Sequence, residues 1–524
     1  MLLTNIYTAV FGTLIAIGFL FRKNDKTALA RKVDVAVCIA IGLIASTFFS
    51  TFPWTKTYTY TDSSVFIYIG KMMKNGYIPY RDLFDHKGII LFFIQFLGAI
   101  LTPGSLTGLW VLEVINISVT AYILYKVTGL FSEDRIVKWL SLITVIIMCG
   151  MKVWEGGNFT EEYALPWISL ALYIFLKYFK SFEYRFSDII WLGVGFAVVA
   201  LLRLNMIAIW IAAMPLIIIR MIYKKQWKEL GNCALAFSIG LCIICIPVLL
   251  YFLCTGSLRD FIDCYFIFNF AYSDGGTNWS AVISSIASGI KLQPYVIVAA
   301  ILSVWPYAKR KEYLLNIWIL LCFLYFSYMS GRYYDHYGIT LLPMWTVFAV
   351  CGLSNLYNVL FFNDRIKFKL KLPGNKLMTL GLILAILGAF FLQYKWANLI
   401  RESMMQTGDV AQLVEYIEQK SEKEDDVLIV GNDCKYYLLA DRKTENKYFY
   451  QNSPKKVSDK VYEGFISELD RCQSDLIIVM GNKEECLARE DNRGKAYNYL
   501  ENQALKGLYE CEMYDSYYAY IKVQ

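Results

Sequence analysis

Acidic and basic side chains gather in short polar segments between the long apolar runs of this 524-residue chain. The carboxylates are Asp62, Asp82, Asp85, Glu161 and Glu162, and the cations are Lys87, Arg203 and Arg332. A carboxylate can deprotonate an acceptor hydroxyl, while Lys and Arg bind a phosphate and offset the charge that grows on it. These residue types suit group transfer from a phosphate-linked donor, provided that the fold brings them to one face.

The chain has two histidines, His86 and His336, and both lie in polar segments beside a basic residue and aromatic residues. His86 precedes Lys87, and His336 belongs to the sequence Arg332-Tyr333-Tyr334-Asp335-His336-Tyr337. Because histidine titrates near neutral pH, both histidines are candidate site residues. Tyr333 is a further candidate, since it lies in the same segment as His336.

Each candidate also has a purely structural interpretation. Asp62 begins an amphipathic stretch that Gly76 ends, so it could be the N-cap of a helix lying flat on a membrane. Glu161 and Glu162 could complement a helix dipole, and Arg203 could extend its side chain to the membrane surface. Both interpretations stay open from the sequence.

The composition places these residues on a membrane protein. Hydrophobic residues make up 57% of the chain and charged residues 18%, and the mean hydropathy is +0.42. Apolar runs long enough, or nearly long enough, to cross a bilayer recur from Met1 to about Tyr394. The thirteen runs are 3–21, 33–53, 88–102, 108–130, 137–151, 163–179, 187–202, 204–222, 232–254, 291–307, 313–329, 337–360 and 377–394.

The distribution of Lys and Arg predicts which loops face the cytoplasm. Six connections are rich in basic residues and are therefore expected inside: 22–32, 126–138, 177–185, 220–228, 309–311 and 365–376. The remaining loops and the C-terminal residues are then outside. Three runs separate the outer loops 54–87 and 152–162, so one of the three does not cross. The run 88–102 is short and ends in Thr-Pro-Gly, which indicates a re-entrant or interfacial segment and leaves about 12 crossings.

The amino-acid composition changes after residue 394. Residues 395–524 hold 18 Lys and Arg against 24 Asp and Glu, so the one hydrophilic region is acidic and nucleic-acid binding is excluded. Strands are expected at 427–431, 476–480 and 517–523, and helices at 409–420 and 459–471. We therefore expect an all-α polytopic membrane module over 1–394, which would hold the catalytic site, and a small extracytoplasmic α/β domain over 395–524.

Over residues 33–360 the chain resembles the GT-C integral-membrane glycosyltransferases. It is most similar to the bacterial branch of protein O-mannosyltransferases, lipid A aminoarabinose transferases and rhizobial galacturonosyltransferase-like proteins. The motifs are the early acid Asp62, Gly76 and Pro79 after the amphipathic stretch, and Lys87 before the re-entrant run. The resemblance implies that Asp62 is a base or acceptor-site carboxylate and that Lys87 binds the lipid phosphate. It also implies that the second acid is Glu161 or Glu162.

The resemblance further assigns the later basic outer hairpin to Arg332 in Arg-Tyr-x-x-His-Tyr. The expected function is transfer of a hexosyl or pentosyl group from a polyprenyl-phosphate-linked donor to a cell-envelope glycan, lipid or protein. The transfer would take place on the outer face of the cytoplasmic membrane. No cofactor is certain, but Asp62 with Glu161 or Glu162 could bind a divalent metal ion across the loops.

Two other functions remain. One is a transporter or flippase of lipid-linked sugars, and the other is an envelope polysaccharide polymerase. Transporters more often show repeated halves with polar sites at the membrane midplane, and this sequence shows neither.

Overall fold

The computed structural model describes residues 28–54, 61–149, 153–273, 278–292, 300–301, 303, 310–362, 408–431, 433–450, 459–481, 492–514 and 517–523. The predicted runs 3–21 and 377–394 lie outside these residues. The chain forms two compact units. The helical unit comprises Met1–Thr55, Leu109–Pro247 and Thr277–Glu402, and the mixed unit comprises Lys56–Gly108, Val248–Gly276 and Ser403–Gln524.

Most apolar runs between residues 33 and 360 form helices. In the helical unit these elements are α2 (Ala28–Ala45), η1 (Ser46–Phe48), α5 (Thr107–Thr128), α6 (Arg135–Ile143), η2 (Thr144–Cys149), α8 (Thr160–Ser181), α9 (Phe186–Ala200), η3 (Leu204–Met206), α10 (Ala208–Tyr223), α11 (Trp227–Cys254), α14 (Trp279–Leu292), α16 (Arg310–Tyr328), η5 (Asp335–Leu341) and α17 (Leu342–Phe362). The end of α11, from Val248, belongs to the mixed unit. Among the described helices, Thr107–Thr128, Trp227–Cys254 and Asp335–Leu356 are long and apolar enough to cross a membrane. The total of about 12 crossings stays a prediction.

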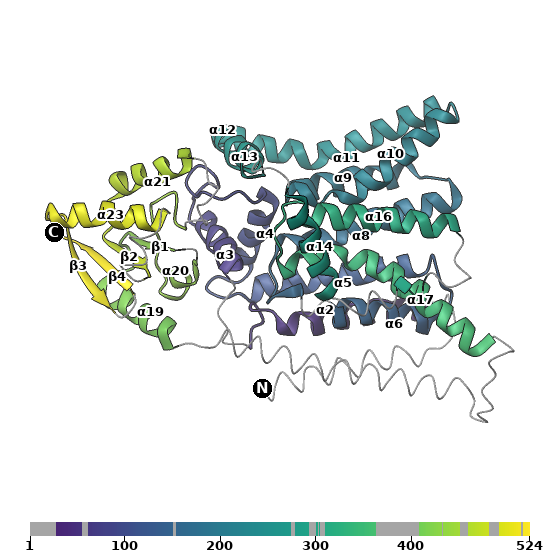
Figure 1. Ribbon diagram of the computed structural model, residues 1–524, viewed down its shortest axis with the longest axis horizontal. Helices are drawn as coiled ribbons and strands as arrows, with labels where there is room; N and C mark the ends of the chain where they lie inside the picture. Colours follow the sequence, from purple (N-terminus) through teal and green to yellow (C-terminus); the bar gives the residue numbers. More distant parts are fainter. Residues whose placement is uncertain are drawn as a thin grey trace, which may run out of the picture. The chain divides into compact units, whose positions relative to one another are not determined.

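Helices of the helical unit pack closely where small residues face one another. A Cβ atom at Gly193 in α9 would lie 2.2 Å from the carbonyl oxygen of Phe237 in α11, so only glycine permits this approach. α9 and α10 are separate helices, as the sequence predicted, and Arg203 lies in the turn between them. α8 packs against both (Figure 1).

The first part of the mixed unit consists of short helices. They are α3 (Thr61–Lys74), α4 (Ile89–Leu101), α12 (Leu258–Phe261), η4 (Ile262–Ile267) and α13 (Phe268–Ser273). α3 is the predicted amphipathic helix, and Gly76 follows it with a φ of +93°, a left-handed conformation that glycine adopts readily. Asp62 lies within the first turn of α3 and is not its N-cap, because the helix begins at Thr61. α4 has 13 residues, in agreement with a run too short to cross.

The second part of the mixed unit is a four-stranded sheet with helices. Its elements are α19 (Gly408–Lys420), β1 (Val427–Val430), α20 (Lys435–Leu439), α21 (Asp459–Cys472), β2 (Leu476–Met480), α23 (Asn492–Leu505), β3 (Tyr509–Tyr514) and β4 (Tyr517–Lys522). The strand order is β1-β2-β4-β3, with β1 and β2 parallel and the other neighbours antiparallel. Leu428, Val430 and Ile477 of the sheet share a core with Phe465 of α21 and Leu500 of α23. Both helices lie beside the sheet (Figure 1).

The three predicted strands and both predicted helices of this region are confirmed. Strand β3 was not predicted, because Glu510 and Glu512 interrupt its sequence YECEMY and leave no apolar run.

Residues 61–87 pack together with the C-terminal residues. Tyr68 of α3 lies 4.8 Å from the ring of Tyr437 and 5.0 Å from that of Phe449. The backbone N–H of Phe84 donates to the carbonyl of Lys447 at 2.8 Å. These two segments therefore form one compact unit, a grouping that the predicted division at residue 395 did not anticipate. The assignment of catalysis to residues 1–394 stays a prediction.

Candidate functional site

The candidate residues fall in both compact units. The mixed unit holds Asp62, Asp82, Asp85, His86 and Lys87, and the helical unit holds Glu161, Glu162, Arg203, Arg332, Tyr333 and His336.

Asp85 fixes the backbone of the loop that carries Lys87. Its side chain is 1% exposed, and its Oδ1 accepts a hydrogen bond from the backbone N–H of Lys87 at 2.7 Å. Its Oδ2 accepts from the hydroxyl of Tyr450 at 3.0 Å. The hydroxyl of the buried Tyr80 donates to the carbonyl of Lys87 at 2.7 Å, so both backbone polar groups of Lys87 are bound. Burial raises the pKa of Asp85, and the charge of Lys87 opposes that shift.

The ammonium group of Lys87 is not paired with any carboxylate among the described residues. Its Nζ lies 3.3 Å from His86 Nε2 and 5.8 Å from the centroid of the Phe66 ring. The imidazole of His86 packs against Phe268 at 5.5 Å, and the amide of Asn269 donates to the carbonyl of His86 at 2.7 Å. A lysine on such a fixed backbone is well suited to bind an anion.

Asp62 and Asp82 occupy different surroundings. Asp62 is exposed on the first turn of α3. Asp82 pairs with Arg81 at 2.8 Å and accepts from the backbone N–H of Ile78 at 2.8 Å. Burial would raise the pKa of Asp82, but these two donors hold it below the usual value. Asp82 lines a polar cavity of about 490 Å³ that Lys447 and other charged residues also line.

Glu161 and Arg203 form an ion pair in the helical unit. An Nη atom of Arg203 contacts Glu161 Oε1, and the other Nη donates to the hydroxyl of Tyr337 at 2.8 Å. The hydroxyl of Thr160 donates to Glu161 Oε2 at 2.6 Å. Burial would raise the pKa of Glu161, but Arg203 and His336 hold it below the usual value, so this carboxylate stays charged. Because Arg203 is paired, the interpretation as a side chain that only extends to the membrane surface is insufficient.

His336 is buried beside this ion pair. Its Nδ1 lies 2.8 Å from Glu155 Oε2, and its ring stacks on Phe159 with centroids 4.4 Å apart. Tyr333 stacks on Tyr328 at 6.1 Å, and Arg332 is partly exposed. The helical unit thus brings together Glu161, Arg203 and His336 from three separate elements.

Glu162 differs from its neighbour Glu161. It is fully buried, and its Oε2 accepts from the backbone N–H of Asn158 at 2.8 Å. Its neighbour Glu113, which lies inside the run 108–130, was not among the predicted site residues. The sequence did contain a signal that could have identified Glu113 as a candidate, because it is the one charged residue between positions 108 and 125 of an apolar run. Glu155, Tyr337 and Tyr450 were also missed, since nothing local distinguishes them.

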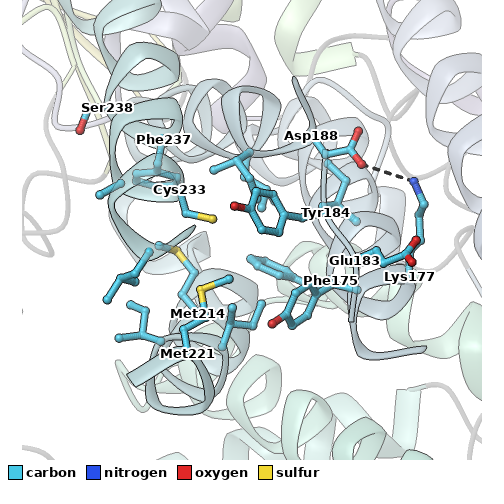
Figure 2. Close-up of a pocket in the computed structure, with 18 residues that line it drawn as sticks. Phe175, Lys177, Glu183, Tyr184, Asp188, Met214, Met221, Cys233, Phe237 and Ser238 are labelled. Carbon is cyan, nitrogen blue, oxygen red and sulfur yellow. Dashed lines mark hydrogen bonds and ion pairs between the residues drawn. The ribbon is translucent and has the colours of Figure 1, made fainter. Parts of the chain in front are cut away.

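A separate apolar cavity of about 270 Å³ lies between α8, α9, α10 and α11 (Figure 2). Met214, Met221 and Phe175 line it, and the Lys177–Asp188 ion pair borders it at 3.4 Å. None of the candidate residues lines this cavity. Within the described part of the chain, no three His, Cys, Asp or Glu side chains are grouped to hold a metal ion.

Two solved structures share the fold of this chain. The chain is similar to the crystal structure of ArnT from Cupriavidus metallidurans bound to undecaprenyl phosphate, with a TM-score of 0.58 and 11% identity, over 95% of this chain and 99% of that chain. It is also similar to ArnT from the same organism in the apo state, with a TM-score of 0.51 and 11% identity, over 94% and 98% of the two chains. The GT-C-like fold expected from the sequence is therefore confirmed.

The family model described as the putative competence-induced protein Ccs4 N-terminal domain matches residues 22–366. The chain belongs to this family. No curated protein matches its sequence.

Proposed function

We propose that this protein is a glycosyltransferase that transfers a sugar from a polyprenyl-phosphate-linked donor to a cell-envelope acceptor. The observation that carries this proposal is the shared fold with an ArnT structure bound to undecaprenyl phosphate, which extends over 95% of this chain. Because a fold alone does not define an activity, the site residues must supply the chemistry.

Lys87 is the proposed ligand of the donor phosphate. Its backbone is held by Asp85 and Tyr80, so no backbone freedom remains to be lost when its side chain binds an anion. Arg203 and Arg332 are proposed to contribute further positive charge. Asp62 is the proposed base, because it is exposed at the start of α3 and is able to meet an acceptor hydroxyl.

The two glutamates take different proposed roles. Glu161 stays charged and holds Arg203, which supports an electrostatic and orienting role. Glu162 is buried away from solvent, and this disfavours a role as the base that meets the acceptor. Between the two acids that the sequence left open, Glu161 is the better candidate for the second site carboxylate.

The site and the C-terminal residues are proposed to face the outside of the cytoplasmic membrane. The packing of residues 61–101 with 408–523 in one unit supports a common side for both. In intact cells, a membrane-impermeant thiol reagent should label Lys74→Cys and Glu424→Cys in a cysteine-free background. Glu183→Cys should react only after permeabilisation. Labelling of Lys74→Cys only after permeabilisation would contradict the proposed sidedness.

The function is tested with purified protein in nanodiscs and a set of radiolabelled polyprenyl-phosphate sugars, with envelope extracts as the acceptor. We expect labelled sugar to appear in the acceptor fraction, and undecaprenyl phosphate to compete with the donor. In proteoliposomes, movement of the intact donor between leaflets without sugar transfer would instead indicate a flippase. Transfer of long lipid-linked oligosaccharides only would indicate a polymerase.

A further inference from the structure

Two fully buried carboxylates of the helical unit, Glu113 and Glu162, take no part in the Glu161–Arg203 pair. Both are 0% exposed. The hydroxyl of Thr51 donates to Glu113 Oε2, and the backbone N–H of Asn158 donates to Glu162 Oε2 at 2.8 Å. Glu113 reaches the same loop, because a Cβ atom at Gly157, the residue before Asn158, would lie 2.8 Å from Glu113 Oε1. Within the described residues, the Oε1 atom of each glutamate has no hydrogen-bond partner.

No cation among the described residues offsets these two carboxylates. The polar side chains of the described residues nearby have other partners, since Glu161 contacts Arg203 and Glu155 contacts His336. Two adjacent negative charges in a buried site without a cation are strongly unfavourable. A pair of carboxyl groups in such a site retains a proton.

We propose that Glu113 and Glu162 share one proton, and that this acid pair holds the loop 155–158 in the conformation that positions Glu155 and Glu161. The hydroxyl of the protonated carboxyl group donates to the free oxygen of the other group. A single proton therefore satisfies both buried Oε1 atoms. Glu113 is a positioning residue in this proposal, because it acts through Glu162 and Asn158.

The conformation of the loop 155–158 depends on contacts with other parts of the chain. Its four consecutive residues have left-handed backbone conformations, with φ of 42° at Glu155, 87° at Gly156, 80° at Gly157 and 64° at Asn158. Such conformations are unfavourable for residues with a side chain, so surrounding contacts must hold them. The backbone N–H of Ser50 binds the carbonyl of Gly156 at 2.8 Å, and the acid pair binds Asn158.

The loop connects the acid pair to the candidate site. Its first residue, Glu155, contacts His336 at 2.8 Å, and three residues after its end Glu161 contacts Arg203. Asn116 of α5 also donates to the carbonyl of Glu162 at 2.7 Å, which fixes α8 against the helix that carries Glu113. The state of the acid pair is thereby transmitted to both charged contacts. This inference does not depend on the sugar-transfer proposal.

Infrared spectroscopy of the purified protein tests the shared proton directly. A protonated carboxyl group has a carbonyl band distinct from the bands of a carboxylate. At neutral pH we expect this band in the unmodified protein and its loss in the Glu113→Gln/Glu162→Gln double variant, which keeps the shape of both side chains. The matched control, Glu183→Gln on an exposed acid, should retain the band. Absence of the band from the unmodified protein, or its persistence in the double variant, would overturn the proposal.

The positioning role is tested by the pH dependence of thermal stability. Burial raises the pKa of Glu162, so the folded protein keeps a proton that the unfolded chain releases. Stability should therefore fall as the pH rises from the usual glutamate value through the raised one. The double variant should lose this dependence, while Glu183→Gln should retain it. An unchanged pH profile in the double variant, or stabilisation of the unmodified protein by added Na⁺ or Mg²⁺ at this site, would refute the shared proton.

Discussion

Arg203 contacts the carboxylate of Glu161 although 42 residues separate the two in the chain. Glu161 is 2% exposed, whereas the side chain of Arg203 keeps 24% of its surface accessible. The pair therefore combines a buried acid with a cation that still reaches solvent. This arrangement leaves donor groups of Arg203 available to a bound anion while Glu161 fixes its orientation.

Glu161→Gln should destabilise the protein, because it leaves Arg203 without its charge partner. Loss of one member of a partly exposed pair is expected to cost about 1–3 kcal/mol. The control is Asp263→Asn, since the side chain of Arg259 in that pair is 92% exposed and the expected cost is below about 0.5 kcal/mol. Thermal unfolding in detergent measures both. Equal effects of the two substitutions would contradict a special role for Glu161.

The same pair has a defined dependence on pH. Because the pKa of Glu161 is lowered in the folded protein, its contribution is complete above the unfolded value of 4.5. That contribution should be lost as the pH falls from this value through the lowered one. Melting temperatures of the unmodified protein should drop over this acidic range, and those of Glu161→Gln should drop less. Parallel pH curves for the two proteins would refute this assignment.

Lys87→Ala should weaken donor binding and leave the fold intact. A hydrogen bond to a charged group contributes about 1.5–3 kcal/mol, so affinity for undecaprenyl phosphate should fall by roughly one to two orders of magnitude. Lys74→Ala, on an exposed lysine at the end of α3, is the matched control. Binding is measured by the shift in melting temperature with added undecaprenyl phosphate. Unchanged binding by Lys87→Ala would remove Lys87 from the site.

Asp62→Asn distinguishes a catalytic carboxylate from a structural one. Asp62 is exposed within the first turn of α3, so the substitution should change stability by less than about 1 kcal/mol. Transfer should fall by about two to four orders of magnitude if Asp62 is the general base. Glu424→Gln, on an exposed acid of the same unit, should transfer normally. Retention of transfer by Asp62→Asn would assign Asp62 only to the helix terminus.

Gly157→Ala and Gly231→Ala should have opposite effects on stability. At Gly157, φ is +80° and a Cβ would lie 2.5 Å from the ring of Phe49 and 2.8 Å from Glu113 Oε1, so a loss of about 1–3 kcal/mol is expected. Gly231 lies in α11 with nothing within 4 Å of a Cβ, so alanine should be neutral or stabilise by up to about 1 kcal/mol. A neutral Gly157→Ala would contradict the tight packing of the loop. Thermal unfolding of both variants is the measurement.

Several local features of the fold were predictable from the sequence because they depend on neighbouring residues. Asp62 and Gly76 mark the two ends of an amphipathic stretch, and helix α3 forms within it. Apolar four- and five-residue stretches marked β1 and β2. The run 88–102 was expected to form a short segment, and α4 has 13 residues, while its re-entrant or interfacial position stays a prediction. Strand β3 escaped prediction because cross-strand pairing with β4, and not its own composition, determines its conformation.

The sequence by itself determined the class of protein, the positions of many of the described helices and the set of residues able to do chemistry, whereas the helices between Leu258 and Leu292 fall mostly where a loop was expected. Hydropathy and charge depend only on the local sequence, so both can be evaluated without a structure. Only the tertiary structure decided which of these residues meet. It paired Glu161 with Arg203, placed Glu162 beside an acid inside a helix, and bound Asp85 to Tyr450, which is 365 residues away. Such contacts depend on how distant segments pack, and no local pattern records that packing.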